Sequence, residues 1–224
     1  MLSAIKFFVL ATLLCGVNLC FVSSSIAQTT DSGQGKLTAP PRPVMPEGHH
    51  DPDKHNHQTK KEASVAEKYF TDVVLLDQDG KSHRFYNDIL KGKTIIINAM
   101  FTSCTNVCPP MNRNFEKIQE ALGDRLGKEA LLISISVDPA NDTPDRLKQY
   151  AKRFHAKPGW LFLTGKKENV DWALYKLGQY AEKPDGHKSI ILIGNEPTGV
   201  WKKAFGLASS DELIRLVEEV LAAK

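Results

Sequence analysis

The sequence predicts an α/β fold in which a mixed central sheet is flanked by helices on both faces. Continuous apolar runs, typical of strands buried on both faces, alternate along the chain with stretches typical of helices. Such alternation indicates parallel strand pairing with helices covering the sheet. A closing strand–strand–helix unit then adds antiparallel strands at one side. The 224 residues, 42% hydrophobic and 25% charged, fit one soluble globular domain with extra segments.

The folded domain is expected over residues 65–224, and it begins with a β-hairpin extension. Residues 69–76 are rich in strand-forming residues, Asp79-Gly80 is a turn signal, and residues 82–86 form the return strand.

The later elements follow from the same patterns. At the start of one helix, Asp142 is the expected capping residue, and Pro144 lies in the first turn, where proline is favoured. In chain order the expected elements are a strand at 94–100, a helix at 110–122, a strand at 130–137, a helix at 142–155, a strand at 160–163, a helix at 168–177, strands at 189–193 and 199–204, and a helix at 210–223.

Residues 1–27 have the features of a secretory signal peptide. Lys6 supplies the positive charge, residues 7–22 are an almost unbroken apolar run, and residues 25–27 (Ser-Ile-Ala) have the pattern of a cleavage site. The apolar run is shorter than the roughly 20 residues of a comfortable membrane span. We therefore expect an exported, periplasmic protein, with cleavage favoured and retention as a periplasm-facing membrane anchor as the alternative.

Residues 28–64 are expected to form a flexible tether rich in proline and histidine. The segment has almost no large apolar residue, and its prolines oppose both helix and sheet. Histidine-rich tracts can bind metal, but the entropy lost on ordering keeps such binding weak. A solvated linker without a metal role is the other interpretation. The histidines concerned are His49, His50, His55 and His57.

The cysteines are more informative than the charge. The formal net charge of +3 is small and gives no reason to expect nucleic acid as a partner. Of four cysteines, Cys15 and Cys20 lie in the signal segment, which leaves Cys104 and Cys108 in the mature chain. A disulfide across so short a loop adds little stability, so this pair indicates a redox-active or metal-binding site in an oxidising compartment.

Cys104 and Cys108 lie between a buried strand and the first turn of a helix. The helix N-terminus favours negative charge, which lowers thiol pKa values and promotes the thiolate. The Cys-x3-Cys spacing is about one helical turn, so both sulfurs can point to the same side. Two neighbouring thiolates suit a soft ion such as Cu(I). An inert disulfide, or two buried thiols, is the alternative.

His187 precedes the apolar strand 189–193. A mixed sheet with a dithiol directly after its first central strand is the thioredoxin arrangement, in which the loop before this later strand lies beside the dithiol. Thioredoxin-like reductases usually have a cis-proline there, whereas no proline lies between His187 and the strand. An imidazole facing two thiolates is a donor set adequate for Cu(I) and for Cu(II). The alternative is a loop histidine that binds nothing.

Asp138 follows the strand 130–137, at the sheet edge where open α/β folds place their sites. It has two interpretations. It either modulates the metal site indirectly, through contacts with the ligand residues, or shapes the turn that leads to the next helix.

Two segments resemble the signatures of the SCO/SenC family. Residues 101–109, FTSCTNVCP, match its Phe-Thr-x-Cys-x-x-x-Cys-Pro pattern, and residues 136–144, SVDPANDTP, match its Ser-Val-Asp-Pro-x-x-Asp-Thr-Pro pattern. Residues 160–165 are similar to the family's Trp-x-x-Leu-Thr-Gly stretch, and a histidine before the Ile-rich strand completes the set. The similarity covers residues 65–224 in order.

The resemblance implies a thioredoxin fold modified for copper, with Cys104, Cys108 and His187 at the ligand positions and Asp138 at an acidic position near them. It also implies a role in assembling the dinuclear copper centre of cytochrome c oxidase, by delivering copper or by reducing the receiving cysteines. The expected partners are the copper-receiving subunit of the oxidase or another exported cuproprotein, and a thioredoxin-like reductant.

The histidine segment departs from the family pattern. The family usually has Asp-His-Ser or Asp-His-Thr, whereas Gly186 and Lys188 flank His187 here. A lysine whose charge points toward the site would oppose the binding of a cation.

The same dithiol supports a second function. A thiol–disulfide oxidoreductase would use Cys104 and Cys108 on exported clients through a mixed disulfide. The longer cysteine spacing and the histidine in place of proline favour copper. A thiol peroxidase ranks last, because that class expects a lone peroxidatic cysteine. A copper chaperone is therefore the first expectation.

Overall fold

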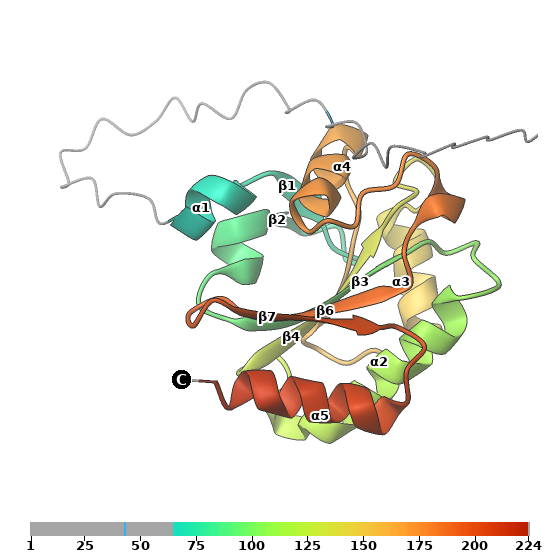
Figure 1. Ribbon diagram of the computed structural model, residues 1–224. Helices are drawn as coiled ribbons and strands as arrows, with labels where there is room; N and C mark the ends of the chain where they lie inside the picture. Colours follow the sequence, from blue (N-terminus) through green and yellow to red (C-terminus); the bar gives the residue numbers. More distant parts are fainter. Residues whose placement is uncertain (1–42, 44–64, 224) are drawn as a thin grey trace, which may run out of the picture. The chain divides into compact units, whose positions relative to one another are not determined.

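A five-stranded mixed sheet with the order β5-β4-β3-β6-β7 organises the fold (Figure 1). The computed structural model describes Pro43 and residues 65–223. β3 pairs in parallel with β4, and β4 with β5, whereas β6 is antiparallel to both of its neighbours. The strands are β3 (Thr94–Met100), β4 (Ala130–Ser136), β5 (Trp160–Leu163), β6 (Ile190–Asn195) and β7 (Val200–Phe205).

Helices cover both faces of this sheet. In Figure 1, α5 and α2 lie below the sheet and α4 lies above it. α3 belongs to the α2 side, because Asn112 of α2 donates a hydrogen bond to the Tyr150 hydroxyl of α3 at 3.0 Å. The helices are α2 (Cys108–Leu122), α3 (Pro144–Arg153), α4 (Lys167–Lys176) and α5 (Ser210–Leu221).

The N-terminal hairpin is confirmed. β1 (Val74–Leu76) and β2 (Ser82–Arg84) pair antiparallel as a separate two-stranded sheet. Reciprocal backbone hydrogen bonds of 2.8 Å between Leu76 and Thr164 attach the hairpin to the end of β5.

The ends of the hairpin differ from the prediction. Tyr69 and Phe70, predicted to be extended, end a short helix α1 (Val65–Phe70), and a π-helix η1 (Phe85–Leu90) replaces the end of the return strand. The helix buries Phe70 against Phe85, with 6.3 Å between ring centroids, and leaves Tyr69 exposed. Packing has therefore overridden the local strand preference of these residues. The other elements lie within two residues of their predicted bounds.

The strand directions determine which loops meet. The register of β3 with antiparallel β6 pairs Asn98 with Ile191. The carboxyl end of β3, which leads to the dithiol, therefore lies beside the amino end of β6, which follows His187.

Two predicted segments fall outside the described residues. They are the signal segment, residues 1–27, and the tether, residues 28–64, apart from Pro43. Over residues 65–223, no helix is long and apolar enough to cross a membrane.

Candidate metal centre

The loop after β3 holds both cysteines close together. The Cys104 backbone N–H donates to the Phe101 carbonyl oxygen at 3.2 Å. Cys108 begins α2, and Pro109 and Pro110 follow in the first turn. Proline is tolerated there because the N–H groups of the first turn make no hydrogen bond within the helix. The Cys108 N–H donates to the Cys104 sulfur at 3.4 Å. Both thiols are free; Cys108 is fully buried and Cys104 is half-buried.

The two thiols differ in acidity. Burial opposes ionisation of Cys104, but hydrogen bonds from the Cys108 thiol and from the N–H groups of Cys108, Asn106 and Val107 outweigh it, so the pKa of Cys104 is lowered. Burial raises the pKa of Cys108 far above its ordinary value, and its hydrogen bond to Cys104 adds to the rise. Cys104 is therefore the accessible thiol that ionises first.

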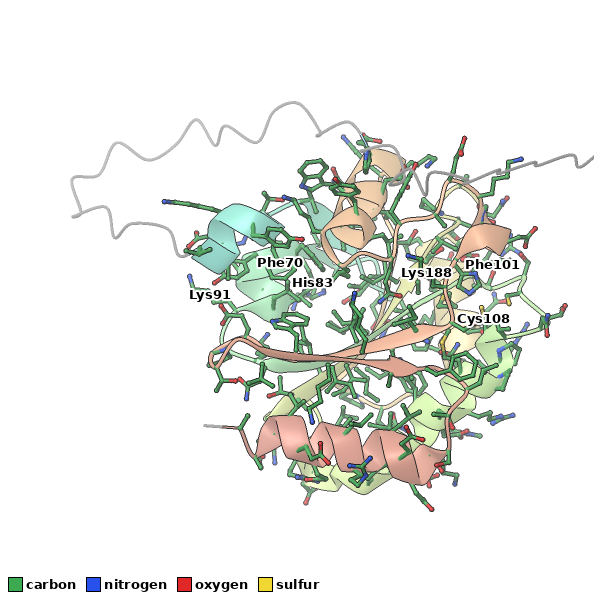
Figure 2. The ribbon with its side chains drawn as sticks, in the orientation of Figure 1. Phe70, His83, Lys91, Phe101, Cys108 and Lys188 are labelled. Atoms are coloured by element: carbon green, nitrogen blue, oxygen red, sulfur yellow. The ribbon has the colours of Figure 1, made fainter. Side chains whose placement is uncertain are left out.

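His187 approaches Cys108 from the loop between η3 (Pro184–Gly186) and β6. Its Nδ1 lies 2.8 Å from the Pro184 carbonyl oxygen, which can only accept, so Nδ1 carries the proton in the neutral ring. The bare Nε2 then lies 3.5 Å from the Cys108 sulfur. The ring packs edge-on against Phe101, with 5.5 Å between centroids, and Figure 2 shows Phe101 and Cys108 at the same end of the sheet. The lone pair therefore faces the dithiol, as a metal ligand requires.

The structure thus brings the three predicted ligands together through pairwise contacts, from Cys104 to Cys108 and from Cys108 to His187. Thiolate sulfur and imidazole nitrogen are donors that suit copper. Among the described residues, no group of three or more Cys, His, Asp or Glu side chains already encloses a metal position.

Asp142 has a different role from the one predicted. The capping prediction is wrong, because Thr143 caps α3 by accepting a hydrogen bond from the Arg146 N–H at 3.4 Å. Asp142 is buried instead. Its carboxylate accepts from the Thr102 N–H at 3.0 Å, from the Thr102 hydroxyl at 2.5 Å and from the Ser136 hydroxyl at 2.6 Å. It therefore fixes the loop that carries Cys104. Its contact with Thr102 spans 40 residues, which no local pattern reveals.

Asp138 has the contacts of a turn residue. Its carboxylate oxygens accept from the Asn141 side-chain amide at 3.0 and 2.9 Å, and its carbonyl oxygen accepts from the Asp142 N–H at 2.8 Å. These contacts favour the turn-shaping interpretation over an effect on the metal.

The remaining predicted positions are on the surface or outside the described residues. Lys188 is exposed. The tether histidines His49, His50, His55 and His57 lie outside the described residues.

Fold and site together define a class of protein, a thioredoxin-like domain whose dithiol is faced by a histidine. The SCO1/SenC family profile matches residues 59–219, and the chain belongs to this family.

Individual relatives agree with this assignment. The chain is 34% identical over 118 residues to the SCO1 protein homolog of Bacillus subtilis, a match covering 51% of this chain and 60% of that relative's length. BsSco, a member of the Sco family of cytochrome c oxidase assembly proteins, has a solved structure with a TM-score of 0.57 and 29% identity, covering 69% of this chain and 94% of that one. The copper-bound structure of ScoI from Bradyrhizobium japonicum has a TM-score of 0.55 and 25% sequence identity, and the match covers 66% of this chain and 96% of that one.

Proposed function

We propose that this protein binds copper as cargo through Cys104, Cys108 and His187 and delivers it during assembly of the dinuclear copper centre of cytochrome c oxidase. The observation that carries the proposal is the His187 Nε2 lone pair, held 3.5 Å from the Cys108 sulfur by the Pro184 carbonyl group. Membership of the SCO1/SenC family and similarity to a copper-bound ScoI support copper as the ion.

The donor set suits transfer. The reduced dithiol would hold Cu(I) as two thiolates, with the imidazole as third ligand. Three ligands leave the ion open to an incoming thiolate, so metal can pass on by ligand exchange. A disulfide that accepts two electrons from the two thiolates would be reduced to two thiols and would leave a Cys104–Cys108 disulfide, and this would release copper because the thiolate ligands are lost.

We also propose that the chain is exported and acts in the periplasm. Its signal segment is either cleaved after residue 27 or retained as a membrane anchor that leaves the domain facing the periplasm. The apolar run and the small residues that follow it support this location. The receiving partner would be the copper-receiving oxidase subunit or another exported cuproprotein, with a thioredoxin-like protein as reductant.

Copper stoichiometry and competition affinity of the reduced chain test the proposal, with His187→Ala as the comparison. We expect one tightly bound copper ion per chain and a sharp loss of affinity in the variant. Absence of tight binding, or affinity that does not change in His187→Ala, would reject the three-ligand site.

A second candidate function rests on the difference between the cysteines. Cys104 is accessible with a lowered pKa, whereas Cys108 is buried with a raised pKa, as in a nucleophile and its resolving partner. Rapid disulfide exchange with model disulfides, together with weak copper binding, would favour this oxidoreductase function.

A further inference from the structure

A pocket of about 440 Å³ opens beside Cys104. Its walls come from the dithiol loop, from α2 and from α3, so it is distinct from the His187 side of the dithiol. From the dithiol loop, Thr102, Ser103 and Thr105, which bear hydroxyl groups, line it together with Cys104. A molecule in this pocket would contact the accessible thiol directly.

Two arginines give the pocket its charge. Arg113 of α2 lies over the Phe154 ring at 5.3 Å, and Arg153 of α3 lies over the Tyr150 ring at 5.8 Å. Stacking of this kind positions a guanidinium group while its N–H donors remain available. Both arginines and both rings line the pocket.

The aromatic wall is itself held in place. The Asn112 side-chain amide donates to the Tyr150 hydroxyl at 3.0 Å, and the Asn98 amide donates to Asn112 at 2.8 Å. Asn98 and Asn112 are fully buried. A ligand would therefore meet a wall that loses little freedom on binding.

The positive charge is only partly compensated. Arg113 donates to Glu116 at 2.9 Å, but the Arg113 side chain is 61% exposed. Glu116 is 14% exposed and also lies 2.6 Å from His155 Nδ1, so it keeps a partner when the guanidinium group turns to a ligand. Over residues 65–223, Arg153 forms no ion pair, and no carboxylate lines the pocket. Two guanidinium groups that line one pocket match carboxylates, which they can bind in a bidentate manner.

We propose that this pocket docks an acidic peptide segment of the protein that exchanges thiolate ligands with Cys104. The proposal rests on the proposed function, in which Cys104 is the ligand that a client reaches. The volume is that of a small-ligand site and exceeds what a single carboxylate fills, and the hydroxyls of Ser103 and Thr105 offer hydrogen bonds to a peptide backbone. The arginines hold the acidic side chains, and the neighbouring cysteine of the client then meets Cys104.

The test uses two cysteine peptides of equal length, each activated as a mixed disulfide with thiopyridine. One has Asp and Glu beside the cysteine, and the other has Asn and Gln. The Cys104 thiolate attacks the peptide sulfur, an S–S bond forms between chain and peptide, and the displaced thiopyridone is followed by its absorbance. The full chain carries Cys15→Ser and Cys20→Ser, so that Cys104 and Cys108 are the remaining thiols.

We expect the acidic peptide to react about fivefold faster than the neutral one at low ionic strength, a preference that salt reduces. In Arg113→Gln/Arg153→Gln the two rates should agree within about twofold. Any change in the reactivity of Cys104 itself affects both peptides equally, so the ratio isolates docking. The matched control is Lys117→Gln/Lys148→Gln, which removes two charges from the same two helices outside the pocket and should retain the preference.

Equal rates for both peptides in the parent chain would overturn the proposal, as would loss of the preference in the lysine control. A preference for a small dicarboxylate disulfide that equals the preference for the acidic peptide would also overturn it, in favour of a low-molecular-weight thiol. Copper affinity is measured on the same variants. Intact copper binding with no peptide preference rejects only the docking site, whereas absent copper binding rejects the proposed function.

Discussion

The two loops that form the site are held in different ways. The dithiol loop is fixed by contacts far away in sequence, since buried Asp142 accepts hydrogen bonds from the Thr102 backbone and side chain. The hydrogen bonds that hold the histidine loop lie within the loop: Gly186 N–H donates to the Lys183 carbonyl oxygen at 2.9 Å, and both the backbone N–H and Nδ1 of His187 donate to the Pro184 carbonyl oxygen. The His187 ring then reaches Phe101 and Cys108 on the other loop. The comparison indicates a firmly held pair of thiols and a more adjustable imidazole, an arrangement that would suit the proposed transfer of copper.

The largest expected effect is removal of a thiol. Cys104→Ser or Cys108→Ser should abolish stable copper binding. Substituting a residue that only contacts a ligand typically lowers metal affinity roughly 10–100-fold, and removing a ligand itself should lower it further. Copper content after gel filtration of the reduced chain is the measurement. The control Cys15→Ser/Cys20→Ser should retain one copper ion. A double Cys104→Ser/Cys108→Ser variant that still holds one copper ion would refute the site.

The next effect compares the two aspartates after β4. Asp142→Ala leaves the Thr102 N–H and two hydroxyl groups without their acceptor, so we expect the free energy of unfolding to fall by about 1–3 kcal/mol. Asp138→Ala loses an exposed hydrogen bond within the turn and should change the free energy of unfolding by less than about 1 kcal/mol. Urea denaturation of both variants decides the matter. Equal losses would mean that Asp142 is not the special anchor of the dithiol loop.

The difference in thiol acidity gives a prediction on pH. Because the pKa of Cys104 is lowered and that of buried Cys108 is raised, iodoacetamide near neutral pH should alkylate Cys104 at least about tenfold faster. Copper binding must displace the Cys108 proton, so affinity should rise with pH by about tenfold per unit for each proton released. Mass spectrometry and competition titrations between about pH 6 and 8 test both statements. An affinity independent of pH would show that binding releases no thiol proton.

The smallest expected effects concern the adjustable loop. His187→Ala should change the free energy of unfolding by no more than about 1 kcal/mol, because the ring is only partly buried and its contacts with Pro184, Cys108 and Phe101 are few, although copper affinity falls. Lys188→Gln should leave copper affinity within about twofold, since Lys188 is exposed and its charge is solvated. A large gain of affinity in Lys188→Gln would instead show that the lysine charge opposes the metal.

Local pattern was sufficient for most of the scaffold. The apolar runs predicted β3 and β5 with their observed bounds, and the strand–dithiol–helix order predicted the thioredoxin-like arrangement. The sequence did not predict α1 and η1. Phe70 and Phe85 lie in helical backbone and pack against each other, and strand propensity takes no account of such tertiary contacts.

The sequence by itself therefore determined the family and the fold, and it predicted which side chains would act as donors, since signature motifs, hydrophobic periodicity and cysteine spacing are local properties of the chain. Tertiary structure alone decided that Asp142 anchors the dithiol loop, that the neutral His187 ring presents Nε2 to Cys108, and that Arg113 and Arg153 stand beside Cys104. These three facts depend on contacts between elements distant in sequence, or on the orientation of a side chain within a folded loop. Such contacts and such an orientation are fixed only when the sheet and helices pack together.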